Sequence, residues 1–347
     1  MGIELKTVKR WLITGGCGFI GTALIRRILE DEPQAMIRVL DNLSVGTRED
    51  LERVAERQRA EGSGRKTADG RQRTEDSGQR SARVELVVGD VRDADVCLRA
   101  AKGVNVIVHL AANTGVGPSV EDPVADMETN VRGILNMLEA ARNNGVSRFI
   151  FSSSGAPVGE VAPPIHEEMA AKPVSPYGAS KLAGEGYCSA YFRSFGVETV
   201  ALRFGNVYGP GSGRKFSVVA KFIKQALEGE SCEIYGDGRQ TRDFIFIEDL
   251  LGAILKAAGL ESEINVWGEV FQIATSREHT LNELVQILGK ELKEQGVSLE
   301  TNYGSARLGD VKRNYSDTSK AARILGWSAE GSLEEGIKRT VAWFLGR

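Results

Sequence analysis

Cysteine and histidine are scarce in this chain. The few that occur lie far apart: Cys17, Cys97, Cys188, Cys232, His109, His166 and His279. Their spacing matches neither a metal-binding knuckle nor a dense disulfide framework, and it does not suggest a histidine-based catalytic triad. We therefore expect reduced thiols, no metal site and no chemistry based on histidine.

Long apolar runs and a strong net charge are also absent. No apolar stretch is long enough to cross a membrane, and the first strand follows the N-terminal residues without the apolar region of a signal peptide. The net charge is −3 and the pI about 5.9, which gives no electrostatic reason to expect nucleic acid or an anionic membrane as a partner. We expect a cytoplasmic protein that acts on a small molecule.

Short apolar runs recur along the first part of the chain. They cover residues 8–14, 36–40, 84–88, 104–110, 148–151 and 199–204. Segments with apolar residues at helical spacing separate them, and this alternation predicts an α/β fold with a doubly wound parallel sheet of the Rossmann type. Small and polar residues follow the runs, at the strand ends where such sheets bind ligands.

The length of 347 residues exceeds the roughly 250 to 300 at which one core stops growing. We expect a large domain over 1–204, to which a segment of about 239–275 returns, and a smaller α/β substrate domain over 205–347. Within the first domain, about 58–83 is rich in charged residues and glycine and has almost no apolar side chains. It cannot offset its ordering entropy, so we expect a solvated mobile loop, with binding of an anionic partner as the alternative.

Gly15, Gly18 and Gly21 form a glycine loop between an apolar run and a helical segment. Without side chains, the loop can turn sharply and approach a pyrophosphate, while the following helix offers free N–H groups to that anion. Asp41 lies about 20 residues further on, where a carboxylate accepts hydrogen bonds from a ribose diol. Its charge would repel the extra phosphate of NADP, so the pattern favours NAD. The nearby Arg48 is the one feature that favours NADP.

Asp90 ends the third apolar run and has two interpretations. It is placed to contact the adenine of the dinucleotide, or to cap a helix that starts near Arg92.

Tyr177 and Lys181 are four residues apart in the segment SPYGASKLAGE. On a helix this spacing places both on one face, so the lysine ammonium can lie against the phenol. A free tyrosine has a pKa of about 10, and a nearby cation favours the phenolate. The pair can therefore supply a base near neutral pH, although two residues on an ordinary helix face would look the same.

Eight short motifs link these features. They read TGGCGFIG, GDVRD, HLAA, FSSS, YGASK, LRFGNVYGPG, GDGRQTRDFIFIEDL and RLGD. In this order, and over nearly the whole chain apart from about 58–83, the sequence resembles an extended short-chain dehydrogenase/reductase of the nucleotide-sugar epimerase and dehydratase family.

The resemblance implies NAD as cofactor and a role for each matching residue. Ser154 would bind the reacting sugar hydroxyl, Tyr177 would be the acid/base, and Lys181 would hold the nicotinamide ribose and lower the tyrosine pKa. The implied cofactor contacts are Gly15, Gly18, Phe19, Ile20, Gly21, Asp41, Asn42, Asp90, Val91, Leu110, Ala111, Ala112, Asn130, Ser152, Tyr177 and Lys181. The implied substrate contacts are Ser154, Tyr177, Asn206, Val219, Tyr235, Arg242, Arg307, Asp310 and Asn314. Two arginines suit a diphosphate, because a guanidinium binds phosphate oxygens in bidentate fashion.

The chain also departs from the family. Members that dehydrate or decarboxylate their substrate resemble one another in placing a carboxylate where this chain has Ala156, and the loop over 155–158 lacks the usual tyrosine. The resemblance therefore implies an NAD-dependent inversion of C4 of a nucleotide-diphosphate sugar, most simply a UDP-hexose, through a 4-keto sugar. The alternatives are dehydration, decarboxylation or reduction on the same scaffold and, more remotely, a non-catalytic dinucleotide sensor. Helices around 122–143 and 177–195 resemble those through which relatives form homodimers.

Overall fold

The computed structural model describes residues 9–54, 56, 83–215, 217–259, 266–306 and 312–346. The stretch of about 58–83 lies outside the described residues except for Arg83. Within the described ranges, none of the helices combines the length and the apolar composition that a membrane-spanning segment needs.

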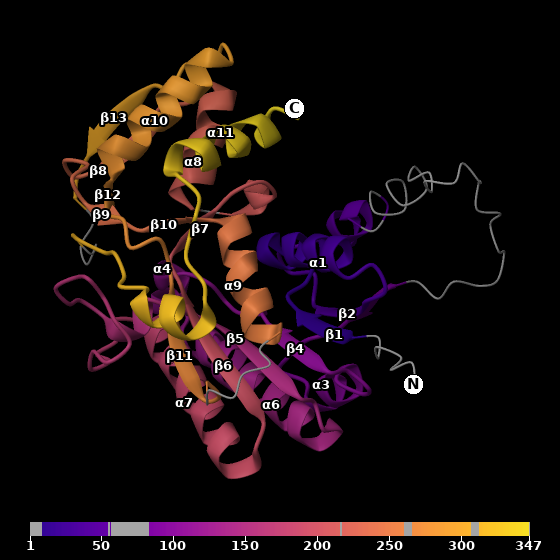
Figure 1. Cartoon of the computed structure of the whole chain (residues 1–347). Helices are drawn as coiled ribbons and strands as arrows, with labels where there is room; N and C mark the ends of the chain where they lie inside the picture. The colour runs from indigo at the N-terminus through magenta and orange to yellow at the C-terminus, as the bar shows by residue number, and fades with distance from the viewer. Residues whose placement is uncertain are drawn as a thin grey trace, which may run out of the picture.

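A parallel seven-stranded sheet forms the centre of the molecule (Figure 1). In chain order its strands are β1 (Arg10–Thr14), β2 (Met36–Asp41), β3 (Val84–Val88), β4 (Val106–His109), β5 (Arg148–Ser154), β6 (Glu198–Phe204) and β11 (Glu269–Ile273). Their order across the sheet is β11-β6-β5-β4-β1-β2-β3, and every pair is parallel. This confirms the predicted Rossmann-type sheet.

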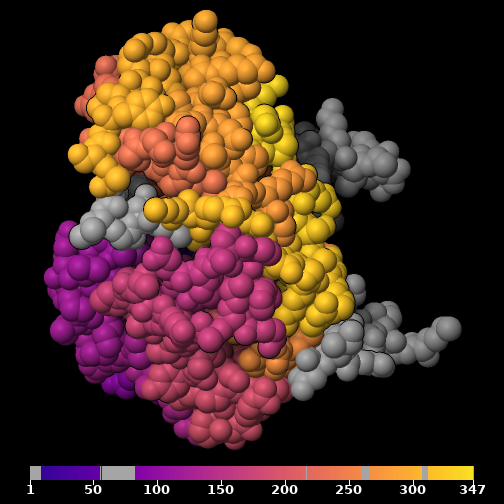
Figure 2. All heavy atoms as spheres, turned by 90° about the vertical axis from the view of Figure 1, so that its left-hand side faces the viewer, coloured from indigo at the N-terminus to yellow at the C-terminus, as the bar shows by residue number. Residues whose placement is uncertain are grey.

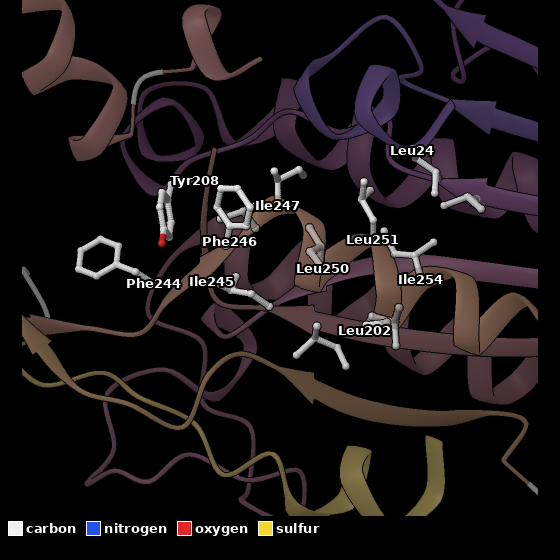
Figure 3. Packing of buried hydrophobic residues seen from close by; sticks show 14 of the residues in the cluster. Leu24, Leu202, Tyr208, Phe244, Ile245, Phe246, Ile247, Leu250, Leu251 and Ile254 are labelled. Carbon is white, nitrogen blue, oxygen red and sulfur yellow. The ribbon is translucent and has the colours of Figure 1, made fainter. Parts of the chain in front are cut away.

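Helices cover both faces of the sheet (Figure 1). The covering helices are α1 (Phe19–Asp31), α3 (Ala94–Ala100), α6 (Gly133–Asn144), α7 (Pro176–Phe195) and α9 (Ile247–Gly259), and α4 (Val116–Glu121) and α5 (Pro123–Met127) pack on α7. Because side chains alternate along a strand, β1 supplies both cores: Trp11 and Ile13 join the cluster that includes α1 and α9, and Leu12 joins the cluster of α3, α6 and α7. Figure 3 shows α9 from close by, with Leu250, Leu251 and Ile254 among the sticks.

The later elements gather over one end of the sheet (Figure 2). They are β7 (Asn206–Tyr208), α8 (Val218–Glu228), β8 (Cys232–Tyr235), β9 (Thr241–Arg242), β10 (Phe244–Phe246), β12 (His279–Thr280), α10 (Leu281–Glu294), β13 (Thr301–Gly304) and α11 (Leu333–Phe344). The strands form three two-stranded sheets, β7 with β10, β9 with β12 and β8 with β13.

The chain crosses between the two regions more than once. After β6 it builds β7, α8 and β8, returns through α9 to β11 at the edge of the large sheet, and then completes the smaller region. The division into domains at residues 204 and 205 stays a prediction.

Candidate active site

The glycine loop connects β1 to the first turn of α1. Gly18 caps the helix without a side-chain hydrogen bond, so the first amides of α1 keep their N–H groups free. Gly15 has a φ of +67°, and a Cβ there would lie 2.9 Å from the amide nitrogen of Ala111. A Cβ on Gly21 would lie 2.5 Å from the Gly15 carbonyl oxygen. The backbone therefore fits closely around a space that suits a pyrophosphate and would be blocked by side chains.

A buried hydroxyl fixes the neighbouring strand end. The Ala111 amide donates to Thr14 Oγ at 3.1 Å, and Thr14 Oγ lies 2.8 Å from His109 Nδ1. Burial lowers the pKa of His109 to about 3, so its ring is neutral at physiological pH. A neutral imidazole carries its proton on one of the two ring nitrogens, so this hydrogen bond joins two uncharged groups. This arrangement holds Leu110, Ala111 and Ala112 beside the glycine loop.

Asp41 closes the loop from the other side. Its two carboxylate oxygens accept from the amides of Cys17 at 2.9 Å and Leu43 at 2.8 Å, and the residue is 8% exposed. Asn42 continues outward and donates from Nδ2 to Asp90 at 3.1 Å. A carboxylate at this position against the glycine loop fits the ribose of NAD.

Asp90 pairs with Arg92 instead of capping a helix. The guanidinium of Arg92 donates to both Asp90 oxygens, at 2.9 and 2.8 Å, and is the main reason why the pKa of Asp90 lies far below its ordinary value. Asp93 is the N-cap of α3, so the capping alternative for Asp90 was wrong. Val91 is buried at 5% exposure.

Asn130 organises the segment after β4. It lies in a π-helical turn, η1 (Glu128–Arg132), that joins α5 to α6, and it is 2% exposed. Its side chain accepts from the Asn113 amide at 2.8 Å and donates to the Asn113 carbonyl at 2.9 Å. It also lies within hydrogen-bonding distance of Asp126 and Ser180. A direct contact of Asn130 with the cofactor stays a prediction.

Ser154, Tyr177 and Lys181 come together at the end of β5. Ser175 caps α7 by accepting from the Gly178 amide at 3.1 Å, which places Tyr177 in the first turn. The side chain of Ser154 lies beside Tyr177 and acts to lower its pKa. One turn later, Lys181 Nζ lies 5.8 Å from the centroid of the Tyr177 ring and donates to the Ser152 carbonyl at 2.8 Å. The structure thus brings two hydroxyls and a buried ammonium together.

The electrostatics of this pair differ from the sequence-based expectation. The pKa of Tyr177 is raised, chiefly by burial, while the Ser154 side chain acts in the opposite direction. Lys181 has a pKa lowered to about 8, again by burial, and the charges of Asp126 and Glu185 limit the decrease. The lowering of the tyrosine pKa by Lys181 stays a prediction, and the Lys181 ammonium donates to the Ser152 carbonyl. The four-residue spacing could not reveal the cost of burial.

The residues expected on the substrate side gather around Thr241. Arg242 donates to the Thr241 carbonyl at 2.7 Å, and the Asn314 amide donates to Thr241 Oγ at 3.3 Å. Asn206 is exposed, and its amide donates to the Asp243 carbonyl at 2.8 Å, next to Arg242 in the chain.

Tyr235 and Val219, two other expected substrate contacts, differ in how far they are buried. Tyr235 ends β8 and is half-buried, with Lys221 Nζ 5.8 Å from its ring centroid. Val219 is 1% exposed within the hydrophobic core, so its side chain offers almost no free surface. Arg307 and Asp310 lie outside the described residues.

The sequence reasoning missed three buried carboxylates. Asp243 accepts from the Thr275 amide at 2.8 Å and from the Ser316 amide at 3.3 Å, and so ties together the segments around Arg242. Glu185 forms a buried ion pair with Arg203. Asp126, on α5, lies near the reaction centre. Glu185 could have been found, because it follows Lys181 by the same four residues that separate Lys181 from Tyr177.

A protein-family comparison decides the wider assignment. The model of the NAD dependent epimerase/dehydratase family matches residues 11–274. The chain belongs to this family. It is therefore an NAD-dependent enzyme of the nucleotide-sugar epimerase and dehydratase type.

Individual relatives extend over nearly the whole length. The chain is 36% identical to a putative UDP-glucose 4-epimerase of Methanocaldococcus jannaschii over 337 residues, which cover 96% of this chain and 97% of the relative. Among solved structures, the UDP-glucose 4-epimerase of Thermotoga maritima with UDP-glucose matches with a TM-score of 0.82 at 33% identity, covering 97% of this chain and 99% of that one.

A dehydratase matches nearly as well. The dTDP-glucose 4,6-dehydratase of Streptomyces venezuelae, solved with NAD bound, has a TM-score of 0.80 at 29% identity and covers 97% of both chains. NAD is thus the cofactor of the family, and it is bound in this solved relative. The glycine loop and Asp41 supply the matching features in this chain.

Proposed function

We propose that this enzyme inverts C4 of a nucleotide-diphosphate sugar, with a UDP-hexose as substrate. Similar proteins support this reaction, because they include a putative UDP-glucose 4-epimerase at 36% identity and a UDP-glucose 4-epimerase at 34% identity. The observation that carries the proposal is local: Lys181 Nζ lies 5.8 Å from the Tyr177 ring centroid, Ser154 lies beside Tyr177, and Ala156 donates from its amide to Ser154 Oγ.

Each residue of the centre has a distinct task in this reaction. NAD, when bound, supplies a hydride acceptor that returns the hydride to the same carbon. Ser154 positions the sugar 4-hydroxyl by hydrogen bonding, and Tyr177 takes the proton from this oxygen and returns it to the same oxygen when the ketone is reduced. Lys181 supplies a positive charge beside Tyr177, held in place by the Ser152 carbonyl. The sugar passes through a 4-ketone that turns over before the hydride returns.

Ala156 favours epimerisation over elimination. Its amide donates to Ser154 Oγ at 3.2 Å. Its carbonyl oxygen lies so close to Gly178 that a Cβ added at Gly178 would be only 2.6 Å from this oxygen. The residue thus packs against the first turn of α7, next to Tyr177, and its methyl group cannot exchange a proton. Glu160 is exposed and four residues away. A 4,6-dehydratase is the second candidate, because such enzymes are similar to this chain at 29% identity.

The proposal is tested by incubating the purified protein with UDP-, dTDP-, GDP- and CDP-sugars. Epimerisation leaves the mass of the sugar nucleotide unchanged, whereas dehydration removes one water, so chromatography with mass spectrometry separates the two. Tyr177→Phe should reduce turnover by about 100-fold or more, because it removes the acid/base. Tyr187→Phe is the matched control, since Tyr187 lies on the same helix and is 37% exposed. Equal rates for wild type and Tyr177→Phe would refute the mechanism.

We also propose that the protein forms a homodimer through α4, α5 and α7. These helices pack together and expose apolar side chains, among them Val116, Val120, Val124 and Met127. Such a contiguous group is typical of a protein interface. Sedimentation velocity of the wild type tests the proposal, and a single monomeric species at micromolar concentration would contradict it.

A further inference from the structure

A π-helical turn interrupts the helix that runs beside α7. This turn, η1, lies between α5 and α6 and contains Asn130, and Asp126 precedes it on α5. Asp126 is 2% exposed, and its Oδ1 accepts from Asn130 Nδ2 at 2.9 Å. Turns of this kind often occur at functional sites. Here the turn lies in a run of helix whose first part, α5, packs directly on α7.

The second oxygen of Asp126 is buried without a hydrogen-bond partner among the described residues. Burying a carboxylate is costly unless an opposite charge compensates it. Asn130 Nδ2 donates to Asp126 and lies 3.2 Å from the hydroxyl of Ser180, the residue before Lys181 on α7, and the charge of Asp126 acts to raise the pKa of Lys181. Lys181 is itself 3% exposed, and its described hydrogen bond goes to a neutral carbonyl.

The other titratable groups around Lys181 are neutral or already paired. On β4, burial keeps His109 uncharged at physiological pH, and on α7 burial raises the pKa of the Cys188 thiol. Glu185 binds Arg203 of β6 through both oxygens, at 2.8 and 2.7 Å. Of the carboxylates that influence Lys181, Asp126 is therefore the one with an oxygen left free within the described residues.

We propose that Asp126 is a positioning residue of the reaction centre, whose free carboxylate oxygen is the counter-charge of the Lys181 ammonium and sets the pH range in which Tyr177 and Lys181 act together. The inference rests on the proposed function of these two residues. The negative charge of Asp126 keeps Lys181 protonated toward higher pH. The same charge also raises the pKa of Tyr177, so it opposes early formation of the phenolate. Both titrations therefore move in the same direction.

Asp126→Asn removes the charge with little change in shape, and the new amide oxygen can still accept from Asn130. In the pH profile of kcat/KM, the two limbs report the macroscopic pKa values of the coupled pair of Tyr177 and Lys181. Loss of a nearby negative charge lowers both pKa values, so we expect both limbs to move by about one unit toward acid pH. Asp126→Glu should restore the original profile. A lower kcat with unmoved limbs would indicate a merely structural role and overturn the proposal.

A second measurement does not depend on turnover. The ultraviolet absorbance of phenolate is titrated against pH in the wild type and in Tyr177→Phe, and the difference isolates the phenolate of Tyr177. The same difference, taken between Asp126→Asn and the double variant Asp126→Asn with Tyr177→Phe, should have its midpoint at lower pH. Glu128→Gln is the matched control, because Glu128 lies two residues away and pairs with the exposed Arg132 at 3.0 Å. It should leave the midpoint unchanged. If no sugar nucleotide is epimerised, the proposed function fails, but this titration still decides whether Asp126 acts on Tyr177. An unmoved midpoint in Asp126→Asn would refute the action of Asp126 on Tyr177.

Discussion

Glu185→Gln should destabilise the protein more than any change to an ion pair on its surface. Glu185 and Arg203 form a bidentate pair at 5% and 4% exposure, and Ser153 donates a further hydrogen bond to Glu185. Among the described residues, Arg203 Nη1 already lacks a partner. Replacing the carboxylate by an amide therefore leaves a buried guanidinium without a counter-charge, between β6 and α7.

The magnitude follows from the burial of the pair. Removing one partner of a buried ion pair costs about 3 to 5 kcal/mol, because the remaining charge stays desolvated. The entropy of unfolding of a chain of this length is about 0.7 kcal/mol per kelvin, so the expected decrease in Tm is about 4 to 7 °C. Replacing both residues, as in Glu185→Met with Arg203→Met, should recover most of this loss, since no charge then remains in the core.

Thermal unfolding followed by circular dichroism measures the effect. Asp31→Asn is the control, because its pair with Arg27 lies at 46% and 36% exposure, and exposed pairs contribute about 1 kcal/mol or less. If Glu185→Gln and Asp31→Asn lowered the Tm equally, the Glu185–Arg203 pair would be hydrated and the reasoning from burial would be wrong.

Two further predictions concern the cofactor side. The free energy of unfolding should fall by up to about 1.4 kcal/mol per pH unit as the pH decreases from about 6 to 5. The reason is that the pKa of His109 is near 3 in the folded protein, below its ordinary 6.5, so the unfolded chain binds a proton that the folded protein does not. Urea unfolding across this range would show the slope, and His109→Gln should flatten it. Gly15→Ala should cost at least about 1 kcal/mol through its positive φ alone, and the clash with the Ala111 amide should reduce the NAD that copurifies. Gly186→Ala is the control, because Gly186 lies on α7 and an added Cβ would meet no neighbouring atom within 4 Å. This change should stabilise the protein by about 0.5 to 1 kcal/mol. Equal NAD content in the Gly15→Ala and Gly186→Ala variants would refute the steric argument.

Six of the seven strands of the large sheet could be predicted because each is an apolar run, whereas β11 was expected only as part of the returning segment of about 239–275. The run at 84–88 coincides with β3, and the others overlap their strands within a few residues. Strands β9 and β12 have only two residues each and no periodicity, so pattern reasoning could not find them. They depend on tertiary contacts that the local sequence does not encode.

The candidate site divides in the same way. Gly15, Asp41, Tyr177 and Lys181 could be identified because their spacing is fixed by one turn, one strand end or one helix face. Asp126 was missed because its position depends on how α5 packs against α7, and the rise in the Tyr177 pKa was missed because burial cannot be inferred from spacing.

The return of the chain to β11 affects how the protein folds during synthesis. Strand β6 is the edge of the sheet until β11 pairs with it, and Val200, Ala201 and Leu202 of β6 are fully buried in the finished protein. Roughly 70 residues separate the ends of the two strands, so at ordinary translation rates the ribosome needs about 4 to 14 s to complete the partner. During that interval an apolar strand edge is open to pairing with other chains. A fragment ending at residue 204 would keep this edge permanently, and would aggregate although it contains the whole glycine loop and reaction centre.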